Sequence, residues 1–191
     1  MIPTVGFALT GSFCTLERTF HLMESLREQY RILPILSERV ASTDTRFFKK
    51  EEVFSRIRDL CGREPITTVA EAEPLGPKNL LDLLVICPCT GNTLSKLAHG
   101  ITDTSVTMAA KSHRRGGKGV LVALSTNDGL SGSAVSLGTL LERKGYFFVP
   151  LRQDAPAEKP RSLQCDFSLL PEAIEAALEG RQLQPIFLPP R

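Results

Sequence analysis

Short apolar runs alternate with amphipathic stretches along this chain. Residues 2–9 form the first apolar run, which stops abruptly at a polar turn, and residues 30–37 form the second. Both have the length and continuity of strands that are buried on both faces. Between them, residues 15–28 carry apolar side chains at helical spacing, which predicts an amphipathic helix. A strand, a helix and a second strand in this order indicate a parallel βαβ unit.

The same alternation continues to the end of the chain. Apolar runs predict further strands at residues 83–87, 120–124 and 146–149, and helical periodicity predicts helices at residues 50–61, 93–99, 105–113, 133–144 and 170–179. Residues 65–79 hold three prolines and are expected to form a short strand or helix with a loop. We therefore expect an α/β fold, a single doubly wound, flavodoxin/Rossmann-like domain over residues 1–191. Its parallel sheet has helices on both faces, and a Pro-rich tail begins at about residue 184.

Composition and charge exclude several classes of protein. The formal net charge of +2 over 191 residues is too small for a typical nucleic-acid or membrane-surface protein. The longest apolar stretch is interrupted by Asp82 and Pro88 and is too short to span a bilayer. No basic-then-apolar leader is visible, and the five cysteines are irregularly spaced. These features predict a cytoplasmic protein with reduced thiols and no metal site.

The loop that follows the first predicted strand is rich in small and hydroxyl residues. Thr10, Gly11 and Ser12 stand between this strand and the first predicted helix. Backbone N–H groups, hydroxyls and the positive end of the helix dipole suit a phosphate at such a turn. The alternative is an ordinary helix cap made by Ser12 or Thr15.

The loop after the strand at residues 83–87 carries more hydrogen-bonding groups than a helix cap needs. An asparagine beside hydroxyl residues can contact a heterocycle or a carboxylate. The candidate cofactor-binding residues of this loop are Pro88, Cys89, Thr90, Asn92 and Thr93. The alternative is again a cap, made by Thr90 or Asn92.

A third polar loop follows the strand at residues 120–124. Ser125, Thr126 and Asn127 are its candidate cofactor-binding residues, although the Asn-Asp-Gly sequence at residues 127–129 is also a common turn. In an open parallel sheet, ligands bind beyond the carboxyl ends of the strands. The convergence of three such loops at one edge therefore predicts a cofactor site.

The second loop carries the pattern P-x-T-x-N-T-x-x-K-x-A-x-G-x-x-D. It resembles the hallmark of the homo-oligomeric flavin-containing cysteine decarboxylase superfamily. The matching residues are Pro88, Thr90, Asn92, Thr93, Lys96, Ala98, Gly100 and Asp103. The turn at residues 10–12 is similar to the phosphate loop of that superfamily, and Ser37 matches a serine that contacts the FMN phosphate in relatives. The resemblance implies FMN as cofactor, bound between the protomers of a homo-oligomer.

Further segments narrow the resemblance to one branch of the superfamily. Residues 42–47, 72–78, 108–111, 125–128, 147–150 with 153–154, and 159–160 are similar to the family of dipicolinate synthase B subunits. That resemblance implies a partner, the A subunit of dipicolinate synthase, which resembles a dehydrogenase and would carry NAD(P). The pair would oxidise a dihydrodipicolinate-type intermediate to pyridine-2,6-dicarboxylate in the mother cell of a spore-forming bacterium.

Two motifs of the decarboxylases are missing. Those enzymes carry a catalytic histidine shortly before the strand that precedes the second loop, whereas residues 73–78 hold no histidine. They also carry Pro-x-Met-Asn after a later strand, and here Ser125-Thr126-Asn127-Asp128 retains the asparagine alone. Cysteine decarboxylation is therefore not expected. Two alternatives stay open: a non-redox protein that binds substrate or flavin, and an FMN-dependent decarboxylase or prenyl-flavin-type relative with changed catalytic residues.

A flat dicarboxylate ligand needs cations or amides for its two carboxylates. The candidate substrate-binding residues are Arg46, Lys78, Asn92 and Lys111. Lys78 stands in a loop shaped by prolines, and Asn92 faces the cofactor in relatives, so these two are also the candidate catalytic residues. For Lys111 the alternative is a solvated helix face, since lysine is mostly exposed.

Overall fold

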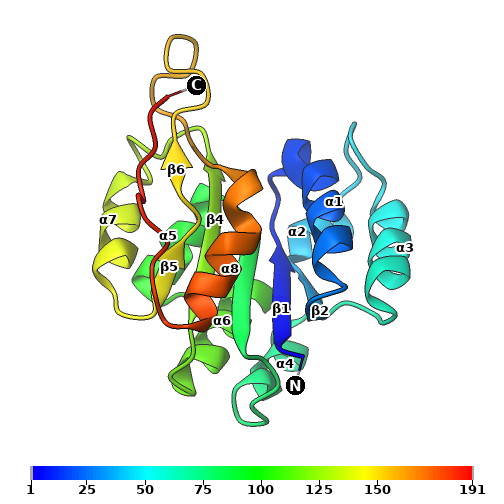
Figure 1. Ribbon diagram of the computed structural model, residues 1–191. Coiled ribbons are helices and arrows are strands. Elements are labelled where there is room, and N and C mark those ends of the chain that lie inside the picture. The colour runs from blue at the N-terminus through cyan, green and yellow to red at the C-terminus, as the bar shows by residue number, and fades with distance from the viewer. Residues whose placement is uncertain (1, 191) are drawn as a thin grey trace.

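A mixed seven-stranded sheet forms the centre of the molecule in the computed structural model, which describes residues 2–190 (Figure 1). The predicted bounds 1 and 191 lie outside the described residues. The strands are β1 (Thr4–Leu9), β2 (Arg31–Leu36), β3 (Leu83–Cys89), β4 (Val120–Thr126), β5 (Tyr146–Phe148), β6 (Leu151–Arg152) and β7 (Leu163–Cys165). Their order is β2-β1-β3-β4-β7-β6, and β5 also pairs with β4. Pairing is parallel among β1 to β5, whereas β7 runs antiparallel to both β4 and β6.

Helices cover both faces of this sheet, as the alternating pattern predicts. They are α1 (Leu16–Leu26), α2 (Glu38–Ser42), α3 (Lys50–Cys61), α4 (Val69–Ala72), α5 (Gly91–His99), α6 (Ser105–Arg115), α7 (Ala134–Glu142) and α8 (Leu170–Leu178). Short 3-10 turns are η1 (Phe13–Thr15), η2 (Glu73–Leu75) and η3 (Phe167–Leu169). Helices α1 and α8 lie on the near face in Figure 1, and α5 and α6 pack behind the sheet. The predicted doubly wound α/β class is confirmed.

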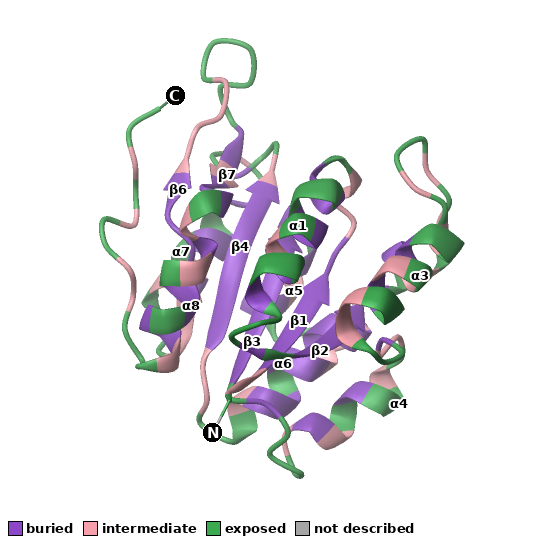
Figure 2. Cartoon of the chain, turned by 45° about the vertical axis from the view of Figure 1, so that its right-hand side comes forward, coloured by how far each residue is buried: buried purple, intermediate pink, exposed green. Residues whose placement is uncertain are grey.

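The core is the central strands themselves. Every residue of β3 is buried, as are five of the six residues of β1. Figure 2 shows these strands as buried ribbons between helices whose outer faces are exposed. Strands buried on both faces read as continuous apolar runs, which is why the sequence predicted them well.

Strand boundaries differ from the sequence prediction by one or two residues, and the antiparallel strands β6 and β7, which make the sheet mixed, were not predicted. Strand β1 begins at Thr4, two residues later than predicted, and β4 continues to Thr126. Strand β3 continues through Pro88 to Cys89, across a cis peptide bond between Cys87 and Pro88. Pro88 has no N–H to donate, and the pairing of β3 with β4 is irregular there, so the proline alters the ladder without ending the strand.

Short segments cover the outer edges of the sheet. Ile66 forms a parallel bridge with Ile35 and exchanges backbone hydrogen bonds with the outer side of β2. At the other end, the tail pairs with β6, where the Leu151 N–H donates to the Ile186 carbonyl at 2.8 Å. The side-chain amide of Gln182 bonds to the N–H and the carbonyl of Phe148 in β5. The Pro-rich tail is therefore part of the folded domain.

Among the described residues, no helix combines the length and the apolar character that crossing a membrane requires.

His113 is a buried histidine near the end of α6. It is 2% exposed, and its Nε2 lies 3.0 Å from the Gly119 carbonyl oxygen. Burial lowers the pKa of His113 from 6.5 to about 4, with smaller contributions from neighbouring cations. The folded state therefore holds a neutral ring at pH values where the unfolded chain already binds a proton.

We predict that the free energy of unfolding falls as the pH drops from about 6.5 towards 4. The difference between the pKa of His113 in the unfolded and folded states corresponds to a loss of up to about 3 kcal/mol of unfolding free energy. His113→Gln keeps a donor for the Gly119 carbonyl but does not titrate, so its stability should depend less on pH across this window. Urea unfolding of both proteins at several pH values measures the difference. If the unfolding free energy of both proteins fell equally with pH, His113 would not be the main cause of the loss of stability.

Candidate functional site

A cavity of about 810 Å³ opens at the carboxyl edge of the sheet. It collects residues that follow β1, β2 and β3, together with the loop between α5 and α6. Its lining residues are Thr10, Gly11, Phe13, Ser37, Glu38, Arg39, Ser42, Thr43, Thr90, Asn92, Thr93, Lys96, Asp103 and Thr104. The first and second polar loops predicted from the sequence thus share one cavity, and Ser37 joins them.

Thr10 links the first loop to the second. Its side chain is 1% exposed, and its hydroxyl donates to the Pro88 carbonyl at 2.7 Å. The same oxygen accepts from the Thr90 N–H at 3.0 Å. One hydroxyl therefore joins the ends of two neighbouring strands and sets where the second loop begins.

Ser12 and Thr15 do not cap the first helix. Neither side chain accepts a hydrogen bond from the helix backbone. The Thr15 hydroxyl instead donates to the Ser12 carbonyl at 2.8 Å, and Ser12 Oγ lies 3.2 Å from Ser125 Oγ. The cap considered from the sequence is therefore wrong for both residues. Ser12 contacts the third loop rather than lining the cavity.

Ser37 and Arg39 stand where β2 gives way to α2. Ser37 caps α2 by accepting from the Val40 N–H at 3.5 Å. Arg39 lines the cavity near Gly11, where an added Cβ would lie 3.8 Å from the Cβ of Arg39. Within residues 2–190, Arg39 forms no ion pair. Sequence reasoning missed this arginine, although its place two residues after Ser37 was an available signal.

The second loop divides between the cavity and the core. Thr90 caps α5 by accepting from the Thr93 N–H at 3.3 Å, so the predicted cap and the predicted cavity residue are the same. Asn92 is exposed in the first turn of α5 and lines the cavity. Pro88 and Cys89 lie in β3 and do not line it. Burial raises the pKa of the Cys89 thiol well above its usual range, so this residue is a packing group.

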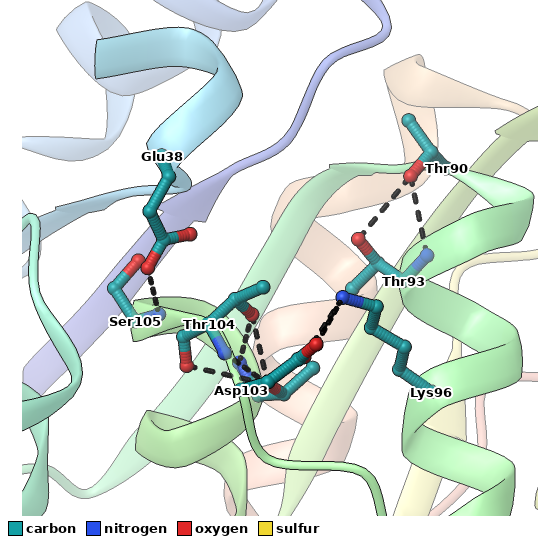
Figure 3. A network of polar contacts seen from close by, with 8 residues as sticks. Glu38, Thr90, Thr93, Lys96, Asp103, Thr104 and Ser105 are labelled. Atoms are coloured by element: carbon teal, nitrogen blue, oxygen red, sulfur yellow. Dashed lines mark hydrogen bonds and ion pairs between the residues drawn. The ribbon is translucent and has the colours of Figure 1, made fainter. Parts of the chain in front are cut away.

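Two carboxylates reach the cavity, and both have partners (Figure 3). Lys96 Nζ lies 2.7 Å from Asp103 Oδ1, and this hydrogen bond lowers the pKa of Asp103. Glu38 Oε1 accepts from the Ser105 N–H at 2.8 Å, at the start of α6. The formal charges of the lining sum to zero, because Glu38 and Asp103 balance Arg39 and Lys96. Within the described residues Arg39 forms no ion pair, so its guanidinium is available to an anionic ligand.

The third loop lies behind the second and does not line the cavity of its own chain. Thr126 and Ser133 donate to the same carboxylate oxygen of Asp128, and the Ser133 bond is 2.8 Å long. This cluster sits against Gly91, the first residue of α5. Ser125 contacts the first loop, and Asn127 is exposed. In a single chain, the third loop supports the start of α5.

The predicted substrate cations do not meet Asn92 within one chain. Arg46 is exposed and stacks over the Phe47 ring at 4.8 Å. Lys78 stands in the segment before β3, and the amino end of a parallel strand lies at the opposite edge of the sheet from its carboxyl end. Lys111 is exposed on α6, away from this cavity. The sequence pattern selected these residues without placing them relative to the cavity.

Residues 2–137 match the model of the family described as Flavoprotein. The chain belongs to the flavoprotein family. The matched residues include all those that line the cavity. Membership of this family supports a flavin cofactor.

Relatives narrow the position of the chain within the flavoprotein family. The chain is 45% identical to the B subunit of dipicolinate synthase of Bacillus subtilis (strain 168), over 96% of this chain and 92% of that protein. The crystal structure of the B subunit of dipicolinate synthase from Bacillus halodurans C is 41% identical, with a TM-score of 0.89 over 97% of this chain and 96% of that chain. The resemblance inferred from the sequence motifs is confirmed.

More distant structures share the fold. The FMN-dependent cysteine decarboxylase SpaF is 22% identical, with a TM-score of 0.70 over 93% of this chain and 95% of that chain. At this identity the likeness establishes the flavoprotein architecture alone.

The donors around the cavity fit a flavin nucleotide. Ser37 and Thr43 offer hydroxyls, and Arg39 offers a guanidinium, close to the small residue Gly11. The Ser42 hydroxyl already donates to the Glu38 carbonyl at 2.6 Å. These are the groups that a phosphate requires. Asn92 and its neighbouring threonines supply both donors and acceptors for the polar edge of a ring. The volume is also in the range of cofactor pockets.

We predict that Gly91→Ala destabilises the protein. A Cβ at this position would lie 2.5 Å from Ser133 Oγ and 2.8 Å from an oxygen of Asp128, closer than atoms can pack. The expected cost is about 1–3 kcal/mol of unfolding free energy. Gly138→Ala in α7 is the matched control, because nothing lies within 4 Å of its added Cβ and alanine favours a helix. Chemical denaturation compares the two, and equal stability would contradict the packing of the third loop on α5.

Proposed function

We propose that this chain is the B subunit of a dipicolinate synthase, which binds FMN and acts with a dehydrogenase-like A subunit that carries NAD(P). The observation that carries the proposal is the 45% identity over 96% of the chain to a protein of that name. The cavity supports it, because its donors suit a flavin phosphate and a ring edge. The reaction is the oxidation of a dihydrodipicolinate to pyridine-2,6-dicarboxylate.

The residues of the cavity divide this work by their chemistry. Ser37 and Arg39 hold the phosphate, since a hydroxyl and a guanidinium both donate to its oxygens. Asn92 donates to and accepts from the polar edge of the ring. Lys96 is held by Asp103, so it shapes the wall instead of binding the phosphate. These residues bind and orient, and the redox chemistry belongs to the cofactor.

Aromatisation of the dihydropyridine releases two electrons and two protons, as one hydride and one proton. Bound flavin would supply a hydride acceptor, and the proton would pass to solvent. The missing histidine at residues 73–78 supports oxidation over decarboxylation of a cysteine substrate. The chain would work in the cytoplasm of the mother cell as a homo-oligomer, in which Lys78 of another copy approaches the cavity.

We predict that the purified protein retains FMN through gel filtration and shows a flavin absorbance band. If the flavin is the hydride acceptor, anaerobic addition of the dihydropyridine substrate bleaches this band, because reduced flavin loses its visible absorbance. A spectrum before and after substrate measures both properties. A retained band that does not bleach would favour a non-redox binding role. Failure to retain added FMN would contradict the cofactor assignment.

We predict that Arg39→Gln weakens the binding of FMN by about tenfold, the usual worth of one charge-assisted hydrogen bond. Riboflavin lacks the phosphate, so its affinity should change little. Arg63→Gln is the control, because Arg63 is exposed and does not line the cavity. Flavin fluorescence quenching gives the affinities. A parallel loss of riboflavin binding would show that Arg39 supports the loop without contacting the phosphate.

A further inference from the structure

A second, smaller cavity of about 360 Å³ lies against the α5–α6 loop. Four cations line it: Lys111, Arg114, Arg115 and Arg143. Its other lining residues are uncharged, namely Leu97, Gly100, Ile101, Thr102, Thr107 and Tyr146. Among the described residues, therefore, no carboxylate lines this cavity.

None of the four cations forms an ion pair within the described part of the chain. Glu73 lines an adjacent hollow together with Lys111 and Arg115, but it is not within ion-pair distance of either. Arg143 donates to the carbonyls of Leu97 and Ala98, at 3.0 and 2.9 Å. Arg114 donates to the carbonyls of Lys118 and Lys144. These bonds fix the two guanidinium groups without cancelling their charge.

Lys111 is the cation of this cluster that the end of α6 does not explain, and its neighbour one turn along the helix is Arg115. They stand four residues apart on α6, where like charges repel each other. A cation in the last turn of a helix is stabilised by the helix dipole, and this accounts for Arg114 and Arg115. Lys111 lies outside the last turn, so the dipole does little for it. An anion between these side chains would remove the repulsion.

The walls of the cavity suit a ligand with a flat apolar ring. Ile101 is 47% exposed, although it is a large apolar residue. Leu97 and the ring of Tyr146 form further apolar surface, and the Arg114 guanidinium lies 5.7 Å from the centre of that ring. Apolar walls with cations around them match an aromatic acid better than a hydrated inorganic ion.

We infer that this second cavity is a binding site for a small aromatic dicarboxylate. Two carboxylates on one ring would engage Lys111 and Arg115, and the ring would lie against Ile101 and Tyr146. The identification of the ligand as pyridine-2,6-dicarboxylate or its dihydro precursor rests on the proposed function. The site itself rests on the charge and shape of the cavity.

The second cavity shares a wall with the flavin cavity. Thr104 lines the first and Thr107 lines the second, and their hydroxyl oxygens lie 2.8 Å apart. Lys96 and Leu97 are likewise neighbours in α5 that line different cavities. One layer of side chains therefore separates the two cavities. A dicarboxylate in the second cavity would be held next to the flavin cavity and would have to move into it for hydride transfer.

Calorimetric titration of pyridine-2,6-dicarboxylate into the purified full chain tests the inference. Lys111→Gln and Arg115→Gln should each weaken binding by about tenfold, and the double variant should weaken it further. Lys144→Gln is the matched control, because Lys144 is a nearby exposed cation that does not line this cavity. All variants should retain the oligomeric state and the flavin of the unaltered protein.

Unchanged affinity in the double variant would overturn the inference. So would loss of binding in Arg39→Gln with no loss in the double variant, since the ligand would then occupy the flavin cavity. Binding of polyglutamate without binding of the dicarboxylate would also overturn it, in favour of an acidic protein surface. Benzene-1,3-dicarboxylate separates the site from the function. If it binds with the same dependence on Lys111 and Arg115 while FMN is not retained, the site stands and the proposed function fails.

Discussion

The buried hydroxyl of Thr10 holds together the ends of the two strands on which the cavity at the carboxyl edge of the sheet is built. It donates to the Pro88 carbonyl and accepts from the Thr90 N–H, so it bonds to both sides of the residue at which β3 ends. Pro88 cannot donate a backbone hydrogen bond, and the pairing of β3 with β4 is irregular beside it. The hydrogen bonds from Thr10 in the first loop therefore fix the end of β3 where its pairing with β4 is irregular. Asn92 follows three residues later, so its position depends on these bonds.

Four charged residues line the cavity, and three of them have partners within the chain. Each of its carboxylates has a partner, which leaves the guanidinium of Arg39 available to a ligand. The α5–α6 loop then separates this cavity from a second one in which positive charges gather without any acidic neighbour in the described lining. The first cavity offers one unpaired guanidinium within a lining of zero net charge, whereas the second is strongly positive. This difference is consistent with a proposal that the first takes a phosphorylated cofactor and the second an acidic small molecule.

The sequence predicted the five parallel strands and the longer helices, because both depend on local periodicity, but it missed the short helix α2 and the antiparallel strands β6 and β7. It also predicted that three polar loops converge, since parallel strands end at the same edge, and in one chain the first two share a cavity while the third does not line it. It misplaced Pro88 and Cys89, because the end of β3 is set by its neighbours and not by the proline. It could not reveal that Ser12 contacts Ser125, 113 residues later, or that Asp128 is packed on Gly91. Those contacts depend on how whole elements dock, which no local pattern encodes. Arg39 could have been predicted from its place two residues after Ser37, but it belongs to none of the sequence motifs that were recognised.

The covered edges of the sheet decide how copies of this chain can meet. Ile66 occupies the outer side of β2, the C-terminal tail occupies β6, and a glutamine side chain takes the place of a neighbouring strand beside β5. Exposed edges are where sheets of separate molecules join into continuous ladders. With these edges occupied, any association between copies would use side chains on helices and loops. The geometry of such an association is therefore specified by the side chains of those surfaces and not by generic backbone pairing. The covered edges also protect the apolar sheet from joining edge to edge into fibres.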